Sequence, residues 1–131
     1  MPMIDVFLAE LGQEIQTTRR LFERLPEDKL AWRPTGKSMS LGQLALHIAT
    51  LPSGVARLVQ ADSMPVPDFQ QAEATSRQQL LDALDTGLAD ARRLLGPLSD
   101  EALATPFSLL RGNTAVMVMP KAAILRVIML N

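Results

Sequence analysis

The residue with the clearest potential for metal chemistry is His47, the only histidine in the sequence. It lies in a segment, residues 40–50, where Ser40 and Gln43 have the spacing of a capping box, in which each side chain satisfies a backbone N–H group at a helix start. Apolar residues then recur at helical spacing as one stripe: Leu41, Leu44, Ile48, Leu51, Val55 and Leu58. His47 falls at the edge of this stripe, which predicts that its imidazole faces the interior of a helical bundle.

An imidazole in such a place requires a polar partner, because burying an unpaired polar group costs roughly 2–7 kcal/mol. The partner is either a divalent metal ion or, more simply, a facing side chain or a water molecule. A metal centre needs several converging ligands, and His47 is one of them at most. The segment therefore makes His47 a candidate metal ligand without deciding between the two kinds of partner.

Composition excludes several other kinds of chemistry. The chain has no cysteine, so it offers no disulfide, no thiolate metal site and no cysteine nucleophile. Its serines have a single histidine to pair with, which argues against a nucleophilic triad, and there is no glycine-rich phosphate loop. Glu10, Glu14 and Glu23 stand at positions that the helical pattern places on an outer face, so none is assigned as a general base.

Charge and hydropathy also limit the partners. A formal net charge of -1 provides no basic surface for phosphates, so nucleic acid is not expected as a partner. No stretch approaches the roughly 18 apolar residues of a membrane-spanning helix, and the N-terminus lacks the pattern of a signal peptide. We therefore expect a cytoplasmic protein that associates with neither nucleic acid nor membrane.

Four segments carry the apolar periodicity of bundle helices, and the expected helices are residues 4–25, 41–61, 77–95 and 119–131. Ser76 and Gln79 form a second capping-box pattern at the start of the third helix. Residues 26–30 and 99–103 are each typical of a short helical turn, and residues 107–114 are expected to form a loop. The fourth helix, from about Pro120 to Asn131, is much shorter than the second, which predicts a domain incomplete at its C-terminus.

Several of these features occur together in one known superfamily. Trp32-Arg33-Pro34, the Ser-x-x-Gln-Leu-x-x-His-Ile pattern at 40–48, the helix after Ser76 and the final segment 120–131 follow one another in a characteristic order. In this order and spacing, essentially the whole chain resembles the DinB/YfiT-like superfamily of metal-dependent enzymes. The resemblance implies an up-down-down-up four-helix bundle, so the expected fold is all-α, with a shortened fourth helix.

The resemblance also implies a three-histidine site for nickel or zinc. His47 matches the ligand from the second helix, and the other two ligands form a His-x-x-x-His pair on the fourth helix near a His-Arg-Gly-Gln segment. In the family this pair comes directly after the segment that ends here at Asn131, and the chain has no other histidine. We therefore expect residues 1–131 to form a single DinB-like domain that binds divalent metal weakly or not at all by itself.

Two functions remain open at this point. The first is a metal-dependent enzyme, a hydrolase or a thiol transferase, acting on a small molecule. The second is a non-catalytic helical module that mediates association. A short fourth helix leaves an apolar groove between its neighbours, and a second copy of the chain would cover it, so we expect a homodimer.

Overall fold

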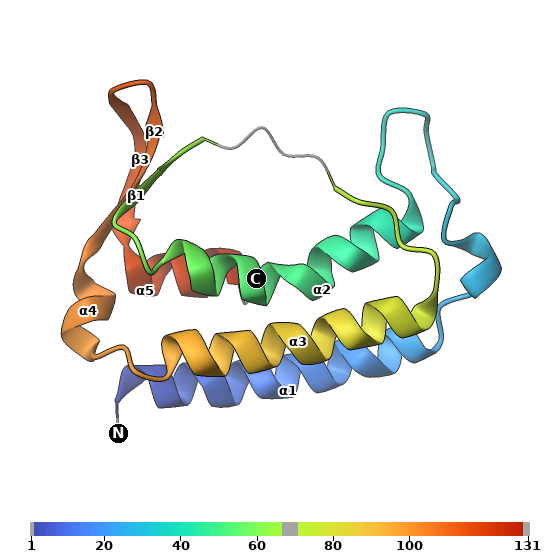
Figure 1. Ribbon diagram of the computed structural model, residues 1–131, viewed down its shortest axis with the longest axis horizontal. Helices are drawn as coiled ribbons and strands as arrows, with labels where there is room; N and C mark the ends of the chain where they lie inside the picture. The colour runs from blue at the N-terminus through green and yellow to red at the C-terminus, as the bar shows by residue number, and fades with distance from the viewer. Residues whose placement is uncertain (1, 67–70, 130–131) are drawn as a thin grey trace.

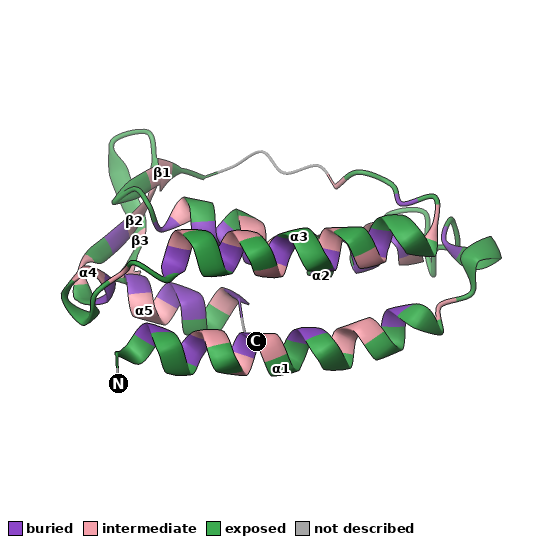
Figure 2. Ribbon diagram, turned by 60° about the horizontal axis from the view of Figure 1, so that its bottom comes forward, coloured by how far each residue is buried: buried purple, intermediate pink, exposed green. Residues whose placement is uncertain are grey.

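Three long helices form the body of the molecule. The computed structural model describes residues 2–66 and 71–129, and its long helices are α1 (Met3–Glu23), α2 (Leu41–Leu58) and α3 (Arg77–Leu95). Helix α3 packs against both α1 and α2, and all three run along the long axis of the molecule (Figure 1). Their buried faces point toward one another (Figure 2). The buried apolar residues of α1 and α3 are Ile4, Phe7, Leu11, Ile15, Phe22, Leu80, Leu84, Ala91 and Leu95.

The starts of α2 and α3 are set by serine caps, as predicted. At α2 the Ser40 hydroxyl accepts a hydrogen bond from the Gln43 backbone N–H at 3.0 Å, and the Gln43 side chain accepts one from the Ser40 N–H at 2.9 Å. At α3 only half of the predicted capping box forms, because Ser76 accepts from the Gln79 N–H but the Gln79 side chain accepts from Thr75. A single cap of this kind stabilises a helix by about 1 kcal/mol.

The remaining elements are short. A 3₁₀ turn, η1 (Glu27–Lys29), follows α1, and α4 (Asp100–Ala104) follows α3, in agreement with the two predicted helical turns. Three strands form one small sheet, β1 (Ser63–Pro65), β2 (Pro106–Arg111) and β3 (Thr114–Pro120). The chain then enters α5 (Lys121–Ile124) and a π-helical turn, η2 (Leu125–Met129). None of the helices in the described ranges is both long enough and apolar enough to cross a membrane.

The prediction of an all-α four-helix bundle is wrong, because the chain forms a three-stranded sheet of order β1-β2-β3. Strand β2 pairs antiparallel with β3 and parallel with β1. Residues 107–114, expected to be a loop, are mostly strand, and Gly112 supplies the φ of +62° that the tight turn to β3 requires. The sheet lies at the same end of the long helices as α4 (Figure 1).

The last helix begins later than predicted. Residues 116–119 belong to β3, and Pro120 both ends that strand and precedes the first residue of α5, so no loop separates the two elements. The helix continues through η2 to Met129, and the predicted end at residues 130–131 lies outside the described residues. Arg126 ties η2 to α1 by donating to both carboxylate oxygens of Glu10 at 2.9 Å. The segment thus lies beside the first turns of α1 (Figure 2).

Candidate functional site

His47 lies in the middle of α2, half-buried, at the contact between α2 and the last helix. It lines a pocket of about 340 Å³. Four apolar side chains share the wall with it, Leu51, Val55 and Leu58 from α2 and Ile128 from η2. Thr50 contributes the other polar side chain, and its hydroxyl donates to the Leu46 carbonyl at 2.8 Å. The pocket is therefore mainly apolar, with an imidazole in its wall.

The face of α2 that packs against the core differs from the predicted stripe. Leu44 and Ile48 were expected inside, but they are 49% and 42% exposed. The buried face instead carries mostly small residues: Gly42, Ala45, Leu46, Ala49, Pro52, Val55 and Ala56. The reason lies in the close approach of α3, where a Cβ atom added at Gly87 would stand 2.9 Å from the Ala49 carbonyl oxygen. A small residue is needed at this closest point, so the face with Ala45 and Ala49 packs on α3 and Leu44 and Ile48 point outward.

The contact between α2 and α3 also has a polar edge. Ser53 donates to a carboxylate oxygen of Asp90 at 2.6 Å, and Arg57 reaches the same oxygen at 3.2 Å. Arg93 donates to the other oxygen at 3.1 Å. The hydrogen bond from Ser53, followed by the one from Arg93, lowers the pKa of Asp90 below its ordinary value, because both stabilise the ionised carboxylate. This arrangement fastens α2 to α3 about two to three turns beyond His47.

Arg33, from the Trp32-Arg33-Pro34 segment, and Ser40, from the pattern at 40–48, hold the start of α2 in place. The fully buried Ser40 hydroxyl donates to Glu73 at 2.9 Å in addition to capping α2. Arg33 donates to Glu73 at 2.7 Å, to Gln43 at 3.0 Å and to the Ser38 carbonyl at 2.7 Å. These bonds join the loop before α2 to the segment before α3, so the motif positions the helix that carries His47. Trp32 itself is 59% exposed.

The residues around His47 do not by themselves fit a three-ligand metal centre. Among residues 2–66 and 71–129, no group of three histidine, cysteine, aspartate or glutamate side chains could hold a metal ion. The other residues that line the pocket offer one hydroxyl and hydrocarbon, and neither replaces an imidazole. The structure thus places His47, the predicted ligand, in a pocket wall. Among the described residues, no further histidine, cysteine, aspartate or glutamate lines this pocket.

Sequence reasoning identified His47, Ser40 and Gln43, but it missed Glu73 and Asp90. Glu73 lies in a segment without periodicity, between the helices, and nothing in the sequence marks it as the partner of Arg33. Asp90 stands on the half-exposed side of α3, where an acidic residue is ordinarily solvated. Ile128 was predicted to be part of the last helix. Its contribution to the His47 pocket depends on where the β2–β3 hairpin places that helix.

Comparison with known proteins identifies the family of the chain. No curated protein and no solved structure matches the chain significantly. A family model described as the DinB superfamily matches residues 10–123. These residues extend from α1 into α5 and include Arg33, Ser40 and His47. The match covers most of the chain, and the chain therefore belongs to the DinB superfamily.

Proposed function

We propose that the chain is the helical domain of a metal-dependent enzyme in which His47 is one ligand of a nickel or zinc ion. The observation that carries the proposal is the position of His47, half-buried in the wall of a 340 Å³ pocket where α2 meets the last helix. Membership of the DinB superfamily supports it. The reaction class that we propose is hydrolysis or thiol transfer on a small molecule.

The number of ligands limits the affinity of the chain for metal. A catalytic zinc site usually has three protein ligands, and the described residues provide one imidazole. We propose that the remaining ligands come from outside the described residues. The chain of 131 residues is then a weak metal binder on its own.

The test uses the fact that the chain has one histidine. Zinc or nickel is titrated into tag-free protein, and the ring-proton resonances of His47 are followed by NMR. We expect one-to-one binding with a dissociation constant of roughly 0.1 mM or weaker, since a single protein ligand leaves most of the coordination sphere to water. Calorimetry of the His47→Ala variant is expected to show no binding at the same concentrations.

Two results would contradict the proposal in different ways. If His47→Ala binds metal as the parent does, His47 is not a ligand. If the parent binds metal with micromolar affinity or tighter, and the variant does not, His47 is a ligand but further ligands are already present in this chain.

The second candidate function is that of an interaction module, and the exposure of Leu44 and Ile48 favours it. No charged residue occurs in α2 from Leu41 to Ala56, so a second copy would meet this face without charge repulsion. Burial of apolar surface contributes about 25 cal/mol for each Å². We propose that the exposed face of α2 forms the contact of a homodimer.

Sedimentation of the parent chain and of Ile48→Glu tests this second candidate. The parent is expected to sediment as a dimer at tens of micromolar, and Ile48→Glu as a monomer, because the contact would bury an unpaired carboxylate. Val127→Glu is the matched control, since Val127 is 52% exposed on the last helix. A parent chain that stays monomeric at these concentrations would exclude the module.

A further inference from the structure

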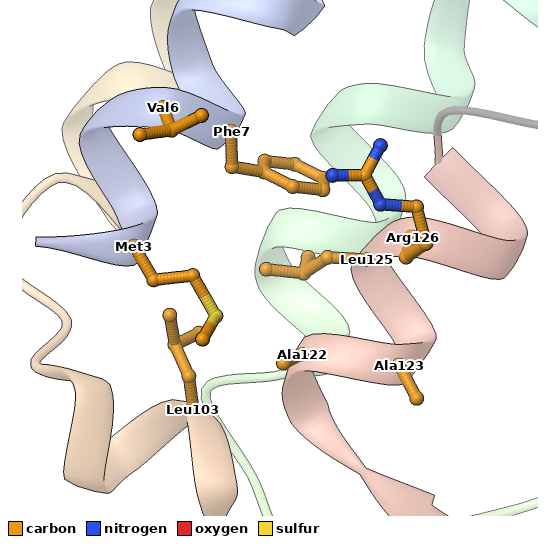
Figure 3. A pocket seen from close by; sticks show the side chains of 8 residues that line it. All are labelled: Met3, Val6, Phe7, Leu103, Ala122, Ala123, Leu125 and Arg126. Atoms are coloured by element: carbon orange, nitrogen blue, oxygen red, sulfur yellow. The ribbon is translucent and has the colours of Figure 1, made fainter.

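A second apolar pocket, separate from that of His47, opens between the start of α1, α4, α5 and η2, and its volume is about 410 Å³. Its floor consists of Phe7, Leu103 and Leu125, which are 6%, 1% and 1% exposed. Met3 and Val6 form part of the rim and are about half exposed. Figure 3 shows side chains from these four elements around the space. The volume falls within the range of small-molecule sites, about 300–1,000 Å³.

The pocket exists because α5 has small residues where it faces α1. Ala122 and Ala123 line it with one methyl group each. At the roughly 30 Å³ that a water molecule occupies in the liquid, the space accommodates about 10 to 20 non-hydrogen atoms. Leu98, Leu103 and the neighbouring core remain packed, so the space is a local gap where α1, α4 and the last helix meet and not a general loosening of the core.

The charge at the rim selects the class of ligand. Among the described residues, Arg126 is the one charged residue that lines the pocket, and its Nη1 donates to both oxygens of Glu10 at 2.9 Å. Its guanidinium carbon also lies 5.8 Å from the centre of the Phe7 ring, which holds the group over the pocket (Figure 3). The ion pair neutralises Arg126, and the Asp100 carboxylate beyond the rim already accepts a hydrogen bond from the Met3 N–H at 2.8 Å, so the described lining offers no unpaired charge. A charged ligand would therefore lose its hydration without gaining an opposite charge.

From these observations we infer that this pocket binds a neutral, mostly hydrocarbon molecule, with an aromatic ring as the best match to the Phe7 and Arg126 faces. Offset stacking on Phe7 and contact with the planar guanidinium both favour a flat ring. The inference does not depend on metal binding at His47, because the two pockets share no residue.

The test uses two probes with the same ring skeleton. N-phenyl-1-naphthylamine is neutral, and 8-anilinonaphthalene-1-sulfonate adds one negative charge to it. Both fluoresce strongly in apolar surroundings. We expect the neutral probe to bind one-to-one with a dissociation constant on the order of 10 µM. The sulfonate probe is expected to bind about tenfold more weakly or less well still, because its charge would be desolvated at a rim without net charge.

Three variants locate the binding site. Ala122→Leu places a larger side chain in the pocket, and we expect it to weaken binding of the neutral probe by about tenfold or more. Ala9→Leu is the matched control on an exposed position of α1 outside the pocket, and it is expected to bind as the parent does. Gly54→Leu places a side chain in the His47 pocket instead, and it is also expected to leave binding unchanged.

If Ala122→Leu does not fold, as judged by circular dichroism, Val6→Trp replaces it, because Val6 is 52% exposed and a large ring there closes the mouth from outside. The absence of saturable binding by the parent would overturn the inference. Loss of binding in Gly54→Leu but not in Ala122→Leu would also overturn it, because the probe would then occupy the His47 pocket. Equal affinity for the two probes would refute the preference for a neutral ligand.

Discussion

A version of the chain extended beyond Asn131 by a helical segment with a His-x-x-x-His pair is expected to bind zinc about 1,000-fold more tightly than the 131-residue chain. The pair would complete the three imidazoles of a catalytic zinc site. The added His47→Ala change is expected to remove most of this gain, because two imidazoles would then remain. Calorimetry, or competition with a chromophoric chelator, measures both values.

The register of the last helix gives the reason. Ile128 lines the His47 pocket from η2. In an α-helix that continues past Met129, residues four and eight positions after Ile128 lie on the same face, and the first of them directly follows Asn131. A His-x-x-x-His pair that starts there would present both imidazoles on the side of the last helix that carries Ile128, toward the face of α2 that carries His47.

Two control extensions separate the effect of where the added histidines lie from the effect of adding a helix or histidines at all. An Ala-x-x-x-Ala segment of the same length shows the effect of the added helix alone. Moving the pair by two residues turns it about 200° around the helix, since each residue turns about 100°. Zinc affinity that is equally high with the shifted pair, or that is independent of His47, would contradict the proposed site.

The second large effect is expected at Gly87, where α3 comes close to the backbone of α2. Replacing Gly87 with leucine would place a Cβ atom 2.9 Å from the Ala49 carbonyl oxygen and 3.6 Å from the Pro52 ring, with the rest of the side chain directed into the helix contact. We expect the free energy of unfolding to fall by about 3 kcal/mol, the upper end of the usual cost of overpacking. Urea denaturation followed by circular dichroism measures this change.

Gly54→Leu is the matched control, because Gly54 is also inside a long helix but no atom lies within 4 Å of the added Cβ. There the gain in helix propensity over glycine, about 0.5–1 kcal/mol, is expected to stabilise the protein. A similar change in stability at both positions would show that the α2–α3 contact is not as close as described.

The sequence predicted α1, α2 and α3 with boundaries within three residues, because periodicity and the serine caps define a helix locally. It did not predict which face of α2 is buried. Apolar periodicity favoured Leu44 and Ile48, whereas the approach of Gly87 selects the face with Ala45 and Ala49. That choice depends on a residue about 40 positions away, on another helix, and so lies outside any local pattern.

The hairpin was missed for a different reason. Residues 107–114, which include Gly112 and Asn113, were expected to form a loop, and the last helix was expected to start at residue 119. Val116 and Val118 alternate with Met117 and Met119, which is a strand period, and β-branched residues favour strands. The signal was therefore present, and the family resemblance led to an all-α interpretation. At the site, His47 was identifiable by residue type, while its pocket depends on the last helix, which only the hairpin places.

The pairing of β1 with β2 has a consequence for the order of folding. Ser63 lies opposite Ser108, so this parallel pair closes a loop of 45 residues, the difference between 108 and 63, that contains α3 and α4. Closing a loop of this length costs more entropy than closing the β2–β3 turn, so β2 and β3 are expected to pair first and to dock on β1 later. Because β3 passes directly into α5, the last helix becomes fixed only at that stage. The wall that Ile128 provides for His47 is thus completed at the end of folding, and it is the first part of the pocket to be lost when the molecule opens locally.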